Sequence, residues 1–551
     1  MRKTARENGV LVKAYAGTTG VILAMNVDDN RRPGLLGFAI ERRDQQDGGE
    51  RWLSGRLNFP GKFYKPGMLM PTKAAPIQKF RWSDYGVEPD GEYVYTIYPV
   101  YGTPDAPKLE TGPTVKVKTA STSGKEHCVL FNRAAAASQA FSKKFPETVR
   151  AMSRARRMRS MFHPPTEALN WLSRGMLEQI LDFIERAAND KWALDIAIYE
   201  YELHEIVETV KMMHAKGAQI RLVYHAKPGD EQTEENEHNL AGLPDSIKRP
   251  RITSKICHHK FIVLSKLARG KRLPQAVLTG STNFTENGVY RQANVVHIVE
   301  QEGMAQQYLN LFEELWRHHD KPAAARKYIN ENNKLTDSQL LLAGFSPRSG
   351  GDDLKFFVQT IQAAKRDVLF CTAFDLDDTI EQALVGNPHD AILRYGLQNT
   401  RSKITGYHAD QTAKFVTAAM LSSGLEGWLK ESKHGQRGNI LIHTKIIIVD
   451  FTSNAPVVIS GSHNLSKNAS AGNDENFLVV RGNTDVADCY GCELMRLYDH
   501  YRFRFQMAER LRKRGPWLAL KPDDSWTNAY FGKSRLKTAD RLRFAGEATL
   551  G

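Results

Sequence analysis

Two short stretches of the sequence place a histidine and a lysine two residues apart at the start of an apolar run. They are His258-x-Lys260 and His443-x-Lys445. Alternate residues of a β-strand share one face, so each histidine is expected to point the same way as its lysine. An imidazole beside an ammonium suits a phosphate ester, because it offers a proton carrier or nucleophile next to a fixed positive charge.

Each pair is followed, after a similar gap, by a Gly-Ser-x-Asn sequence that supplies a tight turn, a hydroxyl and an amide donor. The two turns are Gly280-Ser281-Thr282-Asn283 and Gly461-Ser462-His463-Asn464. With 17 histidines in the chain, one His-x-Lys is expected by chance, but two with matched downstream turns are not. A lone histidine on an apolar strand is usually a core residue, and we expect His259 and His463 to be of that kind.

Both motif sets lie in repeated units. The stretches that begin at Leu177 and Leu354 each show an amphipathic helix, a short buried strand and another helix, followed by the apolar strand with the motif. Strands that alternate with helices predict α/β units with parallel sheets. Two such copies, each of about 170 residues, predict two similar domains packed face to face.

These motifs resemble those of the phospholipase D superfamily, which are His-x-Lys-x4-Asp followed by Gly-Ser-x-Asn. The second copy ends in Asp450 and is complete, and the resemblance covers roughly residues 170–510. It implies two pseudo-symmetric α/β/α domains that share one site for cleaving phosphodiester bonds. One histidine would attack phosphorus to form a phosphohistidine, and the other would protonate the leaving oxygen and then activate water or an alcohol.

The resemblance also implies roles for the remaining motif residues. Lys260, Lys445, Asn283 and Asn464 would hold the non-bridging phosphate oxygens as charge builds up in the transition state. Ser281, Ser462 and Asp450 would support them. The scheme requires no metal and no cofactor.

The first copy departs from the pattern at Ser265, where the family has an aspartate. That aspartate is largely structural in the family, and tyrosyl-DNA phosphodiesterases lack it, so we expect activity to survive. The alternative is a first half that has decayed into a scaffold. The retention of His258, Lys260, Ser281 and Asn283 favours the active interpretation.

A second asymmetry concerns the residue eleven positions after each motif asparagine, which is Asn294 in the first half and Glu475 in the second. In the family, an acidic residue near this place hydrogen-bonds the far nitrogen of the catalytic imidazole. A carboxylate partner raises the pKa of an imidazole more than an amide does. If each residue serves the histidine of its own half, His258 is neutral and attacks, whereas His443 is protonated and acts as the acid.

The charge balance of the chain narrows the classes of molecule that it can bind. The 551 residues include 76 Lys and Arg against 62 Asp and Glu, a formal net charge of +14 that favours anionic partners such as nucleic acid or phospholipid headgroups. A helical, basic segment carries a cluster of arginines that is either a solvated helix face or an approach path for substrate: Arg150, Arg154, Arg156, Arg157 and Arg159. No apolar run reaches the roughly 18 residues of a membrane span. Five scattered cysteines exclude a disulfide framework and favour a reducing, cytoplasmic compartment.

The chain outside the repeats has less specific patterns. Residues 1–120 are predicted to form a β-sandwich, because short aromatic and β-branched stretches such as 93–101 alternate between turns. They resemble a fibronectin type III or immunoglobulin-like domain. We divide the rest into a basic helical linker (121–165), a first half (166–335), a second half (336–515) and a C-terminal tail (516–551) that we do not assign to a role.

Three functions are compatible with these features. The net charge favours a nuclease that acts on DNA or RNA. The same chemistry serves a phospholipase D or phosphatidyl transferase, for which an exposed apolar loop or amphipathic helix beside the site is expected, and the sequence shows no clear one. A non-catalytic nucleic-acid or lipid-binding module is favoured only by Ser265. The sequence makes no prediction of oligomeric state.

Overall fold

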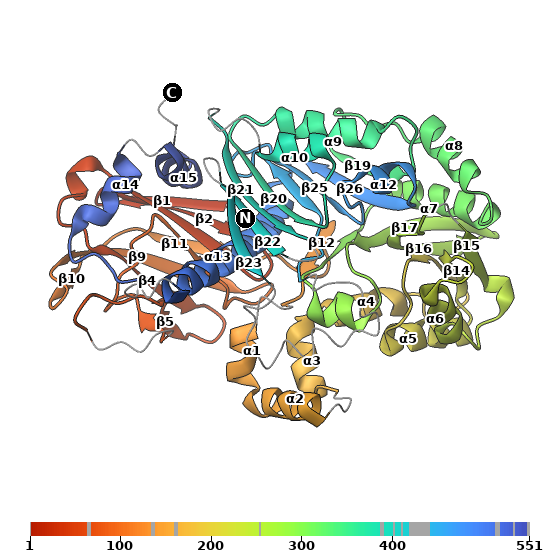
Figure 1. Cartoon of the computed structure of the whole chain (residues 1–551), viewed down its shortest axis with the longest axis horizontal. Helices are drawn as coiled ribbons and strands as arrows, with labels where there is room; N and C mark the ends of the chain where they lie inside the picture. Colours follow the sequence, from red (N-terminus) through yellow and green to blue (C-terminus); the bar gives the residue numbers. More distant parts are fainter. Residues whose placement is uncertain are drawn as a thin grey trace.

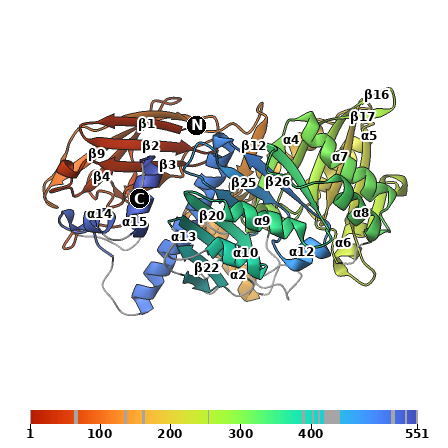
Figure 2. The same cartoon turned by 90° about the horizontal axis from the view of Figure 1, so that it is seen from above.

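The computed structural model describes residues 2–62, 68–133, 138–158, 163–252, 255–385, 391–400, 403–408, 412–417, 441–512, 518–532 and 535–547. Three bodies lie side by side along its longest axis, in the same order in both views (Figure 1, Figure 2). The N-terminal sheets, in red and orange, lie beside the second half, in cyan and blue. The first half, in yellow and green, lies at the opposite end. The N-terminal body is therefore next to the repeat that is remote from it in sequence.

The N-terminal body consists of two antiparallel sheets packed face to face, with the strand orders β1-β2-β3-β8 and β10-β9-β4-β5, and with β11 paired to β9. Tyr95 and Ile97 of β9 share one core with Val12 and Leu23 of the other sheet. This confirms the predicted β-sandwich, whereas its likeness to fibronectin type III or immunoglobulin domains stays a prediction. The elements are β1 (Arg2–Glu7), β2 (Val10–Ala16), β3 (Val21–Val27), η1 (Asp29–Arg31), β4 (Gly37–Asp44), β5 (Glu50–Trp52), β6 (Ser54–Gly55), β7 (Met70–Pro71), β8 (Arg81–Asp84), β9 (Glu92–Gly102), β10 (Pro107–Leu109) and β11 (Thr114–Lys118).

The first half is built on a sheet of order β12-β18-β17-β16-β13-β14-β15. Its strands are β12 (His127–Phe131), β13 (Trp192–Ile198), β14 (Gln219–Ala226), β15 (Lys248–Ile252), β16 (Lys260–Ala268), β17 (Lys271–Gly280) and β18 (Val295–Val299). The helical elements are α3 (Thr166–Ser173), α4 (Met176–Glu185), α5 (His204–Ala215), α6 (Glu231–Asn239), η3 (Asp245–Ile247), η4 (Asn287–Arg291), α7 (Glu302–Arg317) and α8 (Pro322–Asn332).

The second half repeats this plan with the order β19-β26-β25-β24-β20-β21-β22-β23. Its strands are β19 (Leu341–Ser346), β20 (Asp367–Ala373), β21 (Leu393–Asn399), β22 (Lys403–His408), β23 (Thr412–Thr417), β24 (Ile446–Val449), β25 (Val457–Gly461) and β26 (Glu475–Arg481). The helices are α9 (Asp352–Gln362), α10 (Asp378–Val385), α12 (Lys467–Ala471) and α13 (Thr484–Arg512). The fold class predicted from the sequence, two pseudo-symmetric α/β units after a β-sandwich, is confirmed.

Two details of the prediction are wrong. The sheets are mixed, not parallel: β13 is parallel to β14 and β20 to β21, but β16, β17 and β18 are antiparallel neighbours. A connection as short as Arg269–Gly270 between β16 and β17 can join only antiparallel strands. The predicted helical linker, 121–165, is also not wholly helical, because residues 127–131 form β12 and pair with β18, as β19 pairs with β26. Four apolar residues beside a helical stretch were too short a run to indicate a strand.

The C-terminal tail returns to the N-terminal sandwich. It contains η6 (Asp524–Thr527), α14 (Asn528–Phe531) and α15 (Arg535–Ala545). Trp526 and Tyr530 lie in the sandwich core, and the Trp526 indole N–H donates to the carbonyl oxygen of Leu35 at 2.7 Å. The tail therefore completes the hydrophobic core of the domain that begins the chain.

Helix α13 lies between the sandwich and the second half. Its Cys489 and Cys492 are buried, and burial raises the pKa of both thiols. The Cys492 thiol donates to the carbonyl oxygen of Tyr15 at 3.4 Å, which ties the helix to strand β2. In the part of the chain that the structure describes, no helix has the length and apolar character of a membrane span.

Candidate active site

The two His-x-Lys motifs meet where the halves join. The amide N–H of His258 donates to the carbonyl oxygen of Asp474 in the second half, at 2.9 Å. The amide N–H of His443 donates to the carbonyl oxygen of Ala293 in the first half, also at 2.9 Å. Each histidine is thus held by the backbone that precedes a strand of the other half's sheet, β26 or β18, which places both at one interface.

The side chains converge as well. The rings of His258 and His443 lie 6.5 Å apart between centroids, with 78° between their planes. Lys260 and Lys445 are buried beside them, and each ammonium donates to the carbonyl oxygen of its own histidine, at 3.0 and 2.6 Å. The structure therefore brings both motifs into one pseudo-symmetric cluster.

The far ring nitrogens pair across the halves, contrary to the prediction from sequence. The Nδ1 of His258 lies 2.7 Å from Oε2 of Glu475, and the Nδ1 of His443 lies 3.1 Å from Oδ1 of Asn294. The prediction had assigned each partner to the histidine of its own half, and it was wrong because the hydrogen bonds depend on how the halves dock. His258 therefore has the carboxylate and His443 has the amide.

The motif serines hold these partners in place. The Ser462 hydroxyl donates to Oε2 of Glu475 at 2.6 Å, and the Ser281 hydroxyl donates to Oδ1 of Asn294 at 2.8 Å. Asn473, which the sequence analysis did not single out, donates to Oε1 of Glu475 at 2.9 Å. The serines thus orient the histidines indirectly.

The glycine before each serine permits this close packing. A Cβ at Gly280, whose φ is 147°, would lie 2.1 Å from the carbonyl oxygen of Val295. Asn283 and Asn464 end the turns, and each buries a side-chain oxygen that has no hydrogen-bond partner among the described residues. The resemblance assigns the NH2 groups of both amides to the phosphate oxygens, and that role stays a prediction.

Burial sets the electrostatics of the cluster. It lowers the pKa of Lys260 to about 8 and lowers the pKa of Lys445 well below its usual value, with Lys260 adding to the effect on Lys445. It lowers the pKa of His443 well below the usual value, helped by the two lysines, and it raises the pKa of Glu475. Burial of the site thus disfavours its positive charges, and a bound anion would relieve that cost.

Comparison with known proteins identifies the family. A family model described as "cardiolipin synthase, PLD-like domain" matches residues 180–316 and 357–498, together about half of the chain. The chain belongs to the phospholipase D superfamily.

Individual relatives of this phospholipase D superfamily chain are distant. Mitochondrial cardiolipin hydrolase of Xenopus tropicalis is 23% identical over 146 residues, which are 26% of this chain and 62% of that protein. The chain therefore spans less than two thirds of that relative. Among solved structures, phosphatidylserine synthase of Haemophilus influenzae is 12% identical, with 68% of this chain and 94% of that chain covered and a TM-score of 0.42. The phospholipase D family member NUC of Salmonella typhimurium is 17% identical, with 26% and 86% covered and a TM-score of 0.21.

The departure at Ser265 lies within strand β16, five residues after Lys260, where the strand begins. In the second half of this phospholipase D superfamily chain, the Asp450 carboxylate accepts the backbone N–H groups of Lys365 and Arg366 at 2.9 and 2.6 Å, where strand β20 begins. In the first half, β16 runs on past a buried Ser265 into a hairpin. The first half therefore continues the β16–β17 hairpin at the place where the second half has Asp450, and this place is at a distance from the histidines.

Residues that the sequence analysis missed flank the cluster. The Tyr199 ring lies 5.6 Å from that of His258, and the Phe374 ring lies 5.7 Å from that of His443. Glu200 is buried nearby and, like Glu475, acts to raise the pKa of both lysines. Tyr199 and Phe374 each come directly after a buried strand, β13 or β20. This matching position in the two repeats could have indicated from the sequence that they lie at the site.

The predicted arginine cluster is only partly described. Arg150 and Arg154 lie on α2 (Pro146–Met158), which with α1 (Ser138–Lys144) projects from the body in Figure 1, and Arg150 pairs with Glu147 at 2.9 Å. Arg156 and Arg157 belong to the same helix, but their side chains, and all of Arg159, lie outside the described residues. The structure leaves their role a prediction.

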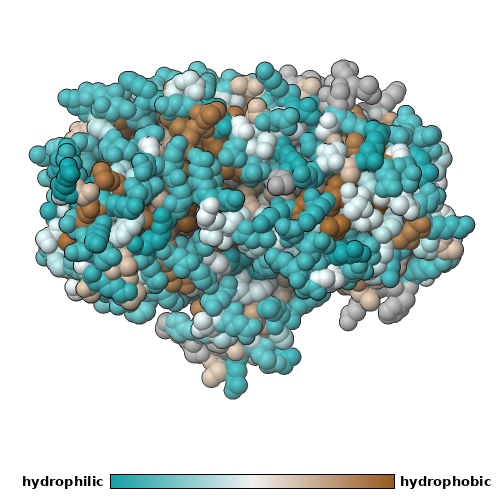
Figure 3. Space-filling view, turned by 180° about the vertical axis from the view of Figure 1, so that it is seen from behind, coloured by the Kyte–Doolittle hydropathy of each residue, from teal (hydrophilic) through white to brown (hydrophobic). Residues whose placement is uncertain are grey.

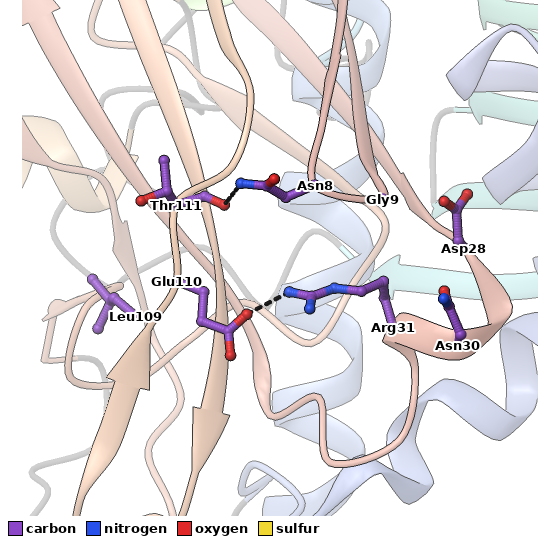
Figure 4. A pocket seen from close by; sticks show the side chains of 8 residues that line it. All are labelled: Asn8, Gly9, Asp28, Asn30, Arg31, Leu109, Glu110 and Thr111. Atoms are coloured by element: carbon purple, nitrogen blue, oxygen red, sulfur yellow. Dashed lines mark hydrogen bonds and ion pairs between the residues drawn. The ribbon is translucent and has the colours of Figure 1, made fainter.

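A separate hollow of about 590 Å³ lies in the N-terminal sandwich (Figure 4). It is lined by Asn8, Gly9, Asp28, Asn30, Arg31, Leu109, Glu110 and Thr111. None of these belongs to the motifs, and Arg31 is paired with Glu110 across it. Within the described ranges, no group of three or more His, Cys, Asp or Glu side chains could hold a metal ion.

Proposed function

We propose that this chain is a phosphodiesterase that works through a phosphohistidine at His258, with nucleic acid as its substrate. The observation that supports the chemistry is the crossed pair of hydrogen bonds, His258 to Glu475 and His443 to Asn294, between two imidazoles that face each other beside two buried lysines. The carboxylate oxygen of Glu475 and the amide oxygen of Asn294 both accept a hydrogen bond, so each histidine carries a proton on Nδ1. Each Nε2 is then the ring nitrogen that reacts with the substrate.

The first step follows from these tautomers. The Nε2 lone pair of His258 attacks phosphorus while the bond to the leaving oxygen breaks, and Nε2–H of a protonated His443 supplies that oxygen with a proton. Phosphorylated His258 carries positive charge on its ring, which the Glu475 carboxylate balances. An amide partner would not balance it, and this argument replaces the within-half argument for His258 as the nucleophile.

The second step reverses the proton transfer. Neutral His443 takes a proton from water, the water oxygen attacks phosphorus, and the P–N bond to His258 breaks. Burial and the two lysines lower the pKa of His443, so the imidazole can lose its proton in the first step and stand neutral for the second. The negative charge of a bound phosphate raises that pKa again, so that His443 can act as the acid in the first step.

The choice of nucleic acid depends on charge. A polymer with an anion at every nucleotide releases counterions when it binds a chain of net charge +14. The exposed large hydrophobic side chains of the described residues are spread over several elements: Met68, Leu69, Leu109, Met158, Met212, Ile252, Leu273 and Leu340. On the face in Figure 3, hydrophobic residues form separate groups within a hydrophilic surface. This arrangement favours a polyanion over a bilayer.

The second candidate is a phospholipase D or phosphatidyl transferase, which the names of the matched family and relatives favour. Parallel incubation with plasmid, single-stranded DNA, RNA and phosphatidylcholine vesicles distinguishes the two, with His443→Ala as the control. We expect hydrolysis of nucleic acid only. Hydrolysis of the vesicles alone would transfer the proposal to lipid.

We also propose a cytoplasmic location, because all five cysteines are free thiols.

Turnover is expected to continue in the presence of EDTA. Lys260 and Lys445 supply the positive charge that Mg²⁺ supplies in many phosphoryl-transfer sites, and neither motif offers a carboxylate cluster of the kind that Mg²⁺ prefers. Initial rates with and without EDTA, on chelator-treated buffers, measure this. A rate that disappears with EDTA and returns with Mg²⁺ would contradict the proposed chemistry.

Nucleic-acid binding is expected to weaken steeply with salt. The logarithm of the binding constant falls linearly with that of the salt concentration, with a slope of about −0.9 for each phosphate contacted on duplex DNA. Charge reversal at Arg154, Arg156 and Arg157 together should reduce this slope and the cleavage of DNA and RNA, while a small chromogenic phosphodiester is still cleaved. Normal cleavage of the polymers by that variant would remove α2 from the substrate path.

A further inference from the structure

Arg251, at the end of β15, is the largest fully buried side chain of the described residues, and its exposed fraction is 0%. Its Nε donates to Oδ2 of Asp474 at 2.7 Å and its Nη2 donates to Oδ1 at 3.3 Å. Its Nη1 donates to the carbonyl oxygen of His318 at 2.7 Å. Arg251 belongs to the first half and Asp474 to the second, so this two-pronged ion pair crosses the interface that contains the histidines.

Asp474 is in direct contact with the backbone of the motif. Its carbonyl oxygen accepts the N–H of His258 at 2.9 Å, and its own N–H donates to the carbonyl oxygen of Ile256 at 3.0 Å. The next residue is Glu475, whose carboxylate holds Nδ1 of His258. The peptide held by Arg251 thus sets both the main chain of His258 and the position of its carboxylate partner.

Among the described residues, no such ion pair stands at the matching place of the other half. Ala293 occupies the place of Asp474 in the contact with His443, and the following residue is Asn294. There the backbone N–H of Asn294 donates to the side-chain oxygen of Asn132 at 3.0 Å, within the same half. The charged clamp is therefore present at the histidine to which we assign the phosphoryl group, and a neutral contact takes its place at the other.

Stability alone is a poor reason for such a pair. The desolvation free energy of two buried charges offsets most of the free energy of their attraction. Well-packed apolar residues at the same positions often give a protein of equal stability. Its site beside Glu475 offers another reason, because an error of about 1 Å in the placement of a reacting group can cost roughly 10²-fold in rate.

We propose that Arg251, through Asp474, is a positioning residue that holds Glu475 against His258 and so sets the rate at which His258 accepts the phosphoryl group. This inference rests on the proposed function. Arg251 touches neither the substrate nor the reacting atoms in this scheme, and acts only through the peptide of Asp474 and Glu475.

The test separates positioning from folding by replacing both partners. Arg251→Met combined with Asp474→Leu removes the clamp without leaving a buried charge unpaired, so the variant can remain stable. With bis-p-nitrophenyl phosphate we expect kcat and the burst rate of p-nitrophenol to fall by about 10–100-fold, with KM within about twofold. Arg221→Met is the matched control: it breaks the Arg221 ion pairs with Asp195 and Glu313 in the same half and should keep kcat.

A second readout does not depend on turnover. The downfield Nδ1 proton of His258, assigned by its loss in His258→Gln, should shift or vanish in the double variant and persist in Arg221→Met. A stable double variant with normal kcat and an unchanged proton resonance would overturn the inference. If the wild type cleaves no phosphodiester, the proposed function fails, and the resonance still decides whether Arg251 holds Glu475 against His258.

Discussion

His258→Gln and His443→Gln are each expected to reduce turnover of an unactivated phosphodiester by about 10³-fold or more, since nucleophilic and acid–base catalysis both lose an essential group. The two rings share one site, so neither half can compensate for the other. Steady-state kinetics on a single-stranded oligonucleotide measure the loss. His204→Gln is the control, because His204 is exposed at the start of α5. Near-normal activity in His258→Gln would make the first half a scaffold.

The same two variants should differ with an activated substrate. With bis-p-nitrophenyl phosphate the leaving group needs no proton, so His443→Gln should release one equivalent of p-nitrophenol in a burst and then stall, since no base activates water. Rapid quench and peptide mapping should find the phosphoryl group on His258. His258→Gln should show no burst. Phosphate on His443 in the wild type would reverse the assignment.

Local patterns predicted the parts of this site that are local in sequence. Each His-x-Lys lies directly before or at the start of one strand, β16 or β24, and each Gly-Ser-x-Asn begins at the last residue of the next strand, so their spacing was enough to identify them. The partner of each imidazole was not predictable in the same way. Glu475 reaches His258 only because the halves dock with residue 474 beside residue 257, and periodicity within a chain carries no information about that docking.

The parts of the fold that were missed have the same cause. Strand β12 is short and takes its stability from pairing with β18, more than 160 residues later. Trp526 reads as an isolated aromatic in a basic tail, yet it packs on Phe80 with ring centroids 5.1 Å apart. Long-range contacts decided both, whereas the helices and strands of the repeats were set by local patterns of apolar residues.

Lys445→Met and Lys260→Met are expected to reduce kcat by about 10²–10³-fold each, the usual cost of removing one donor to a transition-state oxyanion. The same variants should unfold at higher temperature than the wild type near pH 7. Burial penalises both ammonium groups, and methionine fills a similar volume without charge. Lys271→Met is the control, because Lys271 is exposed at the start of β17. It should change neither kcat nor the unfolding temperature.

The pH dependence of this stability difference follows from linkage. The pKa of Lys260 is about 8 in the folded protein and 10.5 by its ordinary value, so between these pH values the unfolded chain binds more protons than the folded one. Stability from this group therefore rises with pH across that window, and its cost is fully present below pH 8. The advantage of Lys260→Met in thermal unfolding should thus be largest near pH 7 and shrink toward pH 10. If Lys260→Met is less stable than the wild type at pH 7, the lost hydrogen bond to His258 outweighs the cost of the buried charge. Phosphate binding would then have no such cost to relieve.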